Sequence, residues 1–302
     1  ITVGTGTLTI AGVGTFTNAG TVTANSITSL AAVPKAISNS GTISMTGITS
    51  FDFNDSFTNS GTATFSTGAS PTMTAAKSFT VASTSTFPAS VSLTMDGSTV
   101  GNYSLDASGL TFNQVTINKT DSDGSGTGYT FTIASGTTVP LGNSPTVTYT
   151  NTNSFGRHIT NNGTITVGTG TLTIAGVGTF TNNGTIQTKT ATLSSSKTFT
   201  NATNSTVIYT GDGDALADTQ TITSFATTYY NLTINSTDGT TDIFALGSAP
   251  TINNNVTVTA GKLSLAGNNL SATGSITVAS GGVLMLNGGE TVTTPTLSSG
   301  ST

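Results

Sequence analysis

Short runs in which apolar and hydroxyl-bearing residues alternate recur along the whole chain. Examples are Ile1-Thr2-Val3 and Thr7-Leu8-Thr9-Ile10, and Gly or Asn-Gly ends each run after three to five residues. A two-residue period places successive side chains on opposite faces of an extended strand, so these runs predict short strands with one buried face. Because no helical period accompanies them, we predict an all-β fold.

Two sequence markers repeat with a common spacing of about 20 residues. The first is an apolar residue, then Thr or Ser, then Asn, and one residue later Gly-Thr; it begins at Phe16, Ile37, Phe57, Ile159 and Phe180. The second is apolar-Thr-apolar with Gly five residues after its start; it begins at Ile1, Phe131, Ile165, Val256 and Ile276. Repeats of this length are typical of solenoids, in which each coil stacks on the one before. We therefore predict a parallel β-helix (β-solenoid) with about 20 residues per coil and some wider coils with loops.

Larger blocks repeat as well. Residues 1–18 recur without change at 165–182, and the run 111–121 is echoed at 228–238. We predict solenoid coils over residues 1–87, a less regular β region over 88–158, and solenoid coils again over 159–302. For the middle region, wide coils and a small inserted β-sandwich are both open interpretations.

The first marker predicts the corners of the coils. The corner residues are Asn18, Asn39, Asn59, Asn161 and Asn182, with Gly20, Gly41, Gly61, Gly163 and Gly184 two residues later. Gly and Asn tolerate positive φ, which we expect these corners to need. We also expect the asparagine side chains to stack in ladders that satisfy buried backbone groups.

The amino-acid composition argues against some classes of binding partner. Only 6% of the residues are charged, the net charge is −5, and the seven Lys and Arg residues are scattered. Nucleic-acid binding depends on clustered cations, so we expect no nucleic-acid partner. No apolar run reaches the roughly 20 residues that a membrane-spanning helix needs. The absence of Cys suits an exported bacterial protein.

Two segments resemble a known group of proteins. TYYNLTINSTDGTT at 228–241 and NNVTVTAGKLSLAGNNLSATGSITVASGGVL at 254–284 resemble the repeat units of secreted bacterial β-strand-repeat and filamentous-haemagglutinin-like surface proteins. The likeness extends over nearly the whole chain, in the form of a shared low-complexity vocabulary. The resemblance implies export, attachment at the cell surface and a parallel β-helix.

Few residues suggest chemistry. Two turns bring acidic residues together, Asp121 with Asp123 and Asp212 with Asp214, and carboxylate oxygens are the ligands that calcium prefers. Neither turn completes a known calcium-binding loop, so solvated turns are the competing interpretation. The single His158 has no positioned carboxylate beside it, and there is no Cys, so the sequence offers no nucleophilic triad. We expect no enzyme and, apart from calcium at these two turns, no cofactor.

These observations favour a structural role. We expect a secreted subunit or segment of an extracellular fibre at a bacterial cell surface, with copies joined head to tail by strand pairing. The pattern begins in mid-unit at Ile1 and strands are expected up to Leu297, so uncovered coil ends would be available to pair with another copy. The competing expectation is an adhesin stalk whose loops at 121–128 and 211–220 bind glycans or cell-surface proteins.

Overall fold

The computed structural model describes residues 1–11, 14–29, 36–45, 50–53, 55–65, 72–75, 77–84, 91–97, 101–110, 112–121, 129–141, 146–151, 157–167, 171–193, 197–211, 213–222 and 225–302. Over these ranges the structure is built of β-strands and contains no α-helix. The chain divides into two compact units. The first comprises residues 1–142, 146–163 and 176–178, and the second comprises residues 143–145, 164–175 and 179–302.

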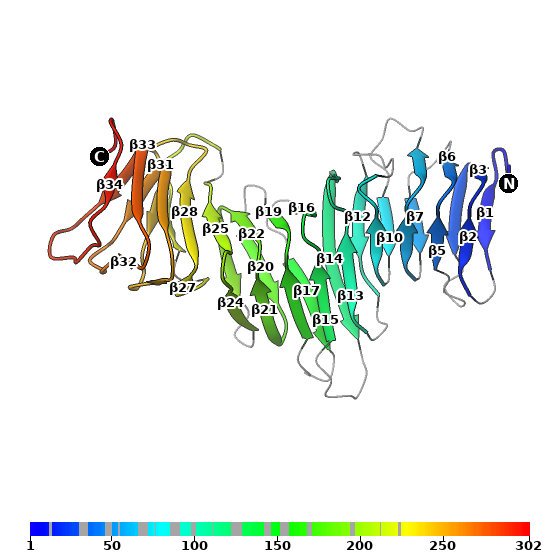
Figure 1. Cartoon of the computed structure of the whole chain (residues 1–302), viewed down its shortest axis with the longest axis horizontal. Coiled ribbons are helices and arrows are strands. Elements are labelled where there is room, and N and C mark those ends of the chain that lie inside the picture. Colours follow the sequence, from blue (N-terminus) through cyan, green and yellow to red (C-terminus); the bar gives the residue numbers. More distant parts are fainter. Residues whose placement is uncertain are drawn as a thin grey trace. The chain divides into compact units, whose positions relative to one another are not determined.

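Parallel pairing between successive coils builds each unit (Figure 1). In the first unit, Phe16 pairs with Ile37 and Ile37 pairs with Phe57. In the second unit, Val256 pairs with Ile276. Residues that share a sequence marker therefore lie in register on adjacent layers, and the predicted parallel β-solenoid is confirmed.

The longest sheet of the first unit takes one strand from each successive coil. Its strands, in order of pairing, are β2 (Phe16–Asn18), β5 (Ile37–Asn39), β8 (Phe57–Asn59), β11 (Phe79–Val81), β13 (Tyr103–Asp106), β15 (Tyr129–Ile133) and β18 (Arg157–Asn161). A second sheet contains β7 (Ser50–Phe53), β10 (Thr72–Ala75), β12 (Ser92–Met95), β14 (Gln114–Asp121) and β17 (Thr146–Asn151). The shorter sheets are β1 (Thr7–Ile10) with β4 (Ser26–Ser29), and β3 (Thr21–Ala24) with β6 (Thr42–Met45) and β9 (Thr62–Phe65); β16 (Thr138–Leu141) follows β15 along the chain.

The second unit repeats this arrangement. Its longest sheet contains β19 (Thr164–Val167), β22 (Thr185–Thr188), β25 (Thr206–Tyr209), β28 (Asn231–Asn235), β31 (Val256–Ser264), β33 (Ile276–Met285) and β34 (Thr296–Leu297). Along the second half of β31 lie β29 (Ile243–Ala245) and then β26 (Thr219–Thr221). The remaining sets are β27 (Thr228–Tyr229) with β30 (Thr251–Ile252) and β32 (Ser271–Ala272), β20 (Thr171–Ala175) with β23 (Thr190–Leu193), and β21 (Gly178–Asn182) with β24 (Lys197–Asn201).

Coil length varies while the parallel register is kept. Paired residues lie 20–22 positions apart from β2 to β11 and 26–28 positions apart from β11 to β18. In the second unit the spacing runs from 19 to 25. The described strands between residues 92 and 161 thus belong to the same parallel sheets as wider coils, and they form no separate β-sandwich.

Columns of apolar side chains along the coil axis form the core. Phe57 and Phe79 lie in register on adjacent coils, and their rings stack with centroids 5.2 Å apart. Phe180 and Phe199 stack in the same way at 5.5 Å. Because the register repeats, an inward apolar residue meets an inward residue of the next coil, and the outward positions are left to Thr and Ser.

The corner glycines have a different role from the one predicted. The φ angle is outside the left-handed range at all five of these glycines and at the asparagine two residues before each of them. Instead, the backbones of stacked corners approach closely. A Cβ on Gly61 would lie 2.1 Å from the carbonyl oxygen of Gly41, and a Cβ on Gly41 would lie 2.0 Å from that of Gly20. The expected positive φ was wrong, and lack of space for a Cβ between coils is the reason for glycine at these inner corners.

Replacing Gly61 by Ala should destabilise the first unit by about 1–3 kcal/mol, because the added Cβ meets backbone that must shift to accommodate it. Gly20→Ala is the matched control, since a Cβ at Gly20 meets nothing within 4 Å. It should change the stability by less than about 0.5 kcal/mol. Urea denaturation followed by circular dichroism measures both changes. Equal losses for the two variants would contradict this explanation.

Candidate functional site

A column of buried asparagines runs along one corner of the first unit. Asn18, Asn39 and Asn59 end strands β2, β5 and β8 and lie in register. The Nδ2 of Asn18 donates to the Oδ1 of Asn39 at 2.7 Å, and the Nδ2 of Asn39 donates to the Oδ1 of Asn59 at 2.7 Å. Each of the three residues is at most 7% exposed. We call them the asparagine column.

The asparagine column also satisfies the backbone where each coil turns. The Nδ2 of Asn39 donates to the carbonyl oxygens of Gly41 and Thr62, each at 3.2 Å. The backbone N–H of Gly20 donates to the Oδ1 of Asn18 at 3.2 Å. A buried polar group without a partner costs about 1–3 kcal/mol, so each amide stabilises both its own turn and the turn of the next coil. The column thereby fixes the place of the corner.

Other coils carry an asparagine at the equivalent corner. Asn161 ends β18, is fully buried, and accepts a hydrogen bond from the backbone N–H of Gly163. In the second unit, Asn182 is fully buried and its Nδ2 donates to the Oδ1 of Asn201 at 3.0 Å. The sequence marker does not identify Asn201 because no Gly-Thr follows it, although the preceding Phe199-Thr200 matches the start of the marker.

Within the described ranges three cations are buried, which we had not expected from the sequence. Lys119, Arg157 and Lys197 are each at most 6% exposed. The Nζ of Lys119 donates to the carbonyl oxygen of Asp96 and lies 4.4 Å from the centre of the Tyr103 ring. The guanidinium of Arg157 lies 5.1 Å from the ring centre of Tyr129, its partner in register. The alternation of inward and outward side chains could have predicted this burial, since Lys119 falls on an inward position of its own strand.

Burial changes the acidity of the two lysines. It lowers the pKa of Lys119 from 10.5 to about 8, and the nearby carboxylate of Asp96 opposes this shift without cancelling it. Burial alone lowers the pKa of Lys197 to about 8 as well. Because desolvation disfavours the charged form, holding these ammonium groups inside the coils costs folding free energy at neutral pH.

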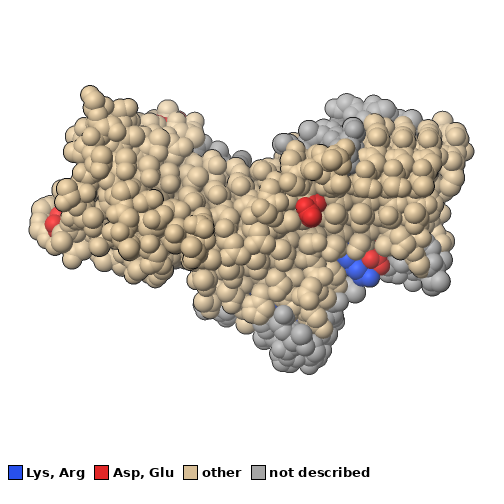
Figure 2. Space-filling model, viewed as in Figure 1, with Lys and Arg blue, Asp and Glu red and all other residues tan. Residues whose placement is uncertain are grey.

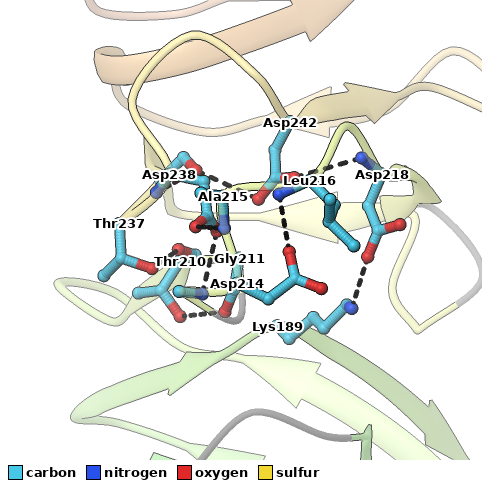
Figure 3. Close-up of polar contacts among 12 residues, drawn as sticks. Lys189, Thr210, Gly211, Asp214, Ala215, Leu216, Asp218, Thr237, Asp238 and Asp242 are labelled. Carbon is cyan, nitrogen blue, oxygen red and sulfur yellow. Dashed lines mark hydrogen bonds and ion pairs between the residues drawn. The ribbon is translucent and has the colours of Figure 1, made fainter.

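The second unit carries a group of acidic side chains on two loops of successive coils, residues 213–218 and 236–242, which we call the acidic loops (Figure 3). The carboxylate of Asp238 accepts hydrogen bonds from the backbone N–H groups of Gly213 and Ala215, both at 2.9 Å. Asp214 accepts from the backbone N–H of Leu216 at 2.8 Å. These carboxylates therefore hold the acidic loops in shape by accepting from backbone donors.

Asp242 is the buried member of the acidic loops, with no exposed surface. Its Oδ2 accepts from the hydroxyl of Ser236 at 3.1 Å, and its Oδ1 accepts from the backbone N–H of Asp218 at 3.3 Å. The side chain of Asp218 in turn pairs with Lys189 at 2.6 Å. Burial raises the pKa of the Asp242 carboxyl, and contact with Asp238 raises it further, against the effect of the donors.

The calcium candidates lie mostly outside the described residues. Asp123, Asp212 and the side chain of Asp121 are not among them, nor is most of the loop 121–128. The fourth candidate, Asp214, is exposed. Within the described ranges, no three His, Cys, Asp or Glu side chains gather closely enough to hold a metal ion.

Arg157 and His158 begin strand β18. Arg157 points inward, and His158 lies in register with Thr130 on the half-buried outward side. Figure 2 shows few charged side chains on the face in view. A helix long and apolar enough to cross a bilayer is absent from the part of the chain that the structure describes.

Comparison with known proteins identifies no relative: no family model matches the chain, and no curated protein or solved structure is significantly similar to it. Of the features that the resemblance to bacterial surface repeats implies, the structure shows the β-solenoid fold.

Replacing Asn39 by Ala should destabilise the first unit by about 1–3 kcal/mol, because it leaves buried groups of Asn18 and Gly41 without this partner. Ser40→Ala is the control at the same corner: Ser40 is exposed and its hydroxyl makes one 3.3 Å bond to the carbonyl oxygen of Asn18. It should cost less than about 0.5 kcal/mol. Chemical denaturation of both variants provides the measurement, and an unchanged midpoint for Asn39→Ala would refute a stabilising role of the column.

The stability of the first unit should rise as the pH increases from about 8 toward 10.5. The pKa of Lys119 is lower in the folded chain than in the unfolded chain, so folding forces a buried charge at lower pH and releases this cost as the lysine deprotonates. Lys119→Met should flatten the pH dependence and stabilise the unit by at most about 3 kcal/mol at neutral pH.

Denaturant midpoints measured over this pH range test the effect of Lys119. Lys77→Met is the control, since Lys77 lies nearer the surface and pairs with Asp55 at 2.7 Å. If Lys77→Met flattens the profile as much as Lys119→Met does, the buried lysine is not the cause.

Proposed function

We propose that this chain is a structural segment of an extracellular fibre at a bacterial cell surface, and that the fibre grows by pairing the first coil of one copy with a coil of another. The parallel β-solenoid supports this role, because each coil presents the same backbone edge as the one before it. The resemblance of residues 228–241 and 254–284 to secreted bacterial surface repeats supports export and surface attachment.

The observation that carries the proposal is the outward-facing backbone of strand β2. Within the described residues, β1 pairs with β4, and β2 pairs with β5. The N–H of Phe16 and the C=O of Asn18 bond to the next coil. Because the backbone of a parallel strand points to alternate sides, the N–H and C=O of Thr17 point away from β5. Such an edge is a template for another strand.

The repeated block gives a second line of support. Leu8 and Phe16 in the first copy are half-buried, whereas their identical counterparts Leu172 and Phe180 in the second copy are fully buried. The same sequence therefore buries more apolar surface in one setting than in the other. A coil of another copy placed on β1 and β2 would cover Leu8 and Phe16, and apolar burial contributes about 25 cal/mol per Å².

Thr17→Pro should abolish fibre formation without altering the fold. Proline removes the N–H that faces away from β5 and is tolerated at sheet edges. Thr17→Val keeps this N–H and a similar shape, so it should assemble like the parent chain. Electron microscopy and light scattering over a concentration series, with circular dichroism as the check on folding, provide the measurement. A parent chain that stays monomeric at every concentration, or a Thr17→Pro variant that forms the same fibres, would overturn the proposal.

A further inference from the structure

The carboxyl groups of Asp238 and Asp242 meet inside the acidic loops of the second unit. The two side chains are in hydrogen-bonding contact. A Cβ on Gly211 would lie 2.1 Å from the Oδ2 of Asp242 and 2.8 Å from the Oδ2 of Asp238, so both oxygens border the same small space. Two carboxylates this close cannot both be ionised without strong repulsion, and a hydrogen bond between them requires one proton.

The surroundings decide which carboxyl group keeps that proton. Asp238 accepts two backbone N–H bonds at 2.9 Å, which favours its ionised form. Asp242 is fully buried, and it accepts one hydroxyl bond and one longer backbone bond at 3.3 Å. Burial disfavours the charged form, so the proton resides on Asp242 and is donated to Asp238.

Among the described residues, charged groups on neighbouring elements make contacts of their own. Lys189 pairs with Asp218 on the preceding coil, and Asp214 accepts from the backbone of its own loop. On the following coil, Lys262 lies in register with Ile243, with its side chain on the half-exposed outward side, and only its backbone N–H bonds to Asp242.

We propose that Asp238 and Asp242 share one proton, and that loss of this proton as the pH rises releases the loop 213–218 from the coil that carries Asp238. The loop depends on this contact because its backbone N–H groups at Gly213 and Ala215 bond to the Asp238 carboxylate. When Asp242 ionises, the two carboxylates repel each other and Asp238 is displaced together with the loop that it holds.

The direction of the pH dependence follows from the folded state of Asp242. Burial, and then contact with Asp238, raises the pKa of this carboxyl above its value in an unfolded chain. The protonated form is therefore the one that folding favours, so the stabilisation is complete at low pH and is lost as the pH rises through the raised pKa. We call this proton-dependent contact between Asp238 and Asp242 the acid latch. It lies within a single chain and does not depend on fibre assembly.

Hydrogen exchange of the Gly213 and Ala215 amides tests the acid latch in the full chain. Their protection factors, corrected for the intrinsic pH dependence of exchange, should fall as the pH rises, by at most about tenfold per pH unit because one proton is involved. The amide of Thr277, on the paired strand β33, is the internal reference and should keep its protection. Constant protection factors at Gly213 and Ala215 over the range from acidic to mildly alkaline pH would overturn the proposal.

Two variants identify the titrating group. In Asp242→Asn the side-chain amide donates to Asp238 at every pH, so protection of the loop should lose its pH dependence. Asp218→Asn removes the neighbouring carboxylate that pairs with Lys189 and should keep the parent profile. A parent-like profile in Asp242→Asn, or its loss in Asp218→Asn alone, would assign the effect to another group and overturn the proposal.

A titration of the unsubstituted chain covers the case in which Asp242→Asn does not fold. The carboxyl carbon shifts of Asp238 and Asp242, followed by NMR, should change in two separated steps, one of them above the ordinary range of an aspartate. Coincident titration of both residues in the ordinary range would overturn the shared proton.

Discussion

Hydrogen bonding between the backbones of successive coils is the constraint on which the rest of this structure depends. In both units the described strands pair in parallel with strands one coil away, and the register shifts at bulges where β31 meets β28 and β33. A given position therefore faces the equivalent position of its neighbour, and whatever suits one coil must suit contact with its own copy. Phenylalanine stacks on phenylalanine, asparagine bonds to asparagine, and glycine occupies inner corners where backbones leave no room for a Cβ.

The fold could be predicted from the sequence because this constraint produces short patterns that repeat along the chain. Alternation over three to five residues indicates a strand, and the spacing of the two markers indicates the coil. The width of the coils between residues 92 and 161 was less accessible. There the strands stay in register while the segments between them lengthen, so the spacing of markers no longer reports the pairing. The reason for the corner glycines could not be read from a single coil, since it depends on the distance to the coil below.

The polar interior was only partly predictable. The asparagine corners follow from the marker, and Lys119 could have been placed inside by extending the alternation from Val115 and Ile117. The contact of Asp238 with Asp242 had no comparable signal. It depends on how the loop 236–242 folds back on itself, and on Gly211 of the preceding coil leaving space beside both carboxyl groups. The bond from the Gly213 backbone to Asp238 is not recorded in a short motif either, because the two residues lie on loops of separate coils, 25 residues apart in the chain.

The exact repetition of residues 1–18 at 165–182 sets a problem for folding. A newly made coil finds its place by matching strands with the coil next to it, and these two segments offer the same strands and the same asparagine corner. Strand pairing alone does not distinguish the place of residues 1–18 from that of residues 165–182. Ambiguity of this kind leads repeat proteins to misassemble. The two copies first differ just beyond the shared segment, where Ala19 stands in one and Asn183 in the other, so any discrimination between the two sites has to come from outside that segment.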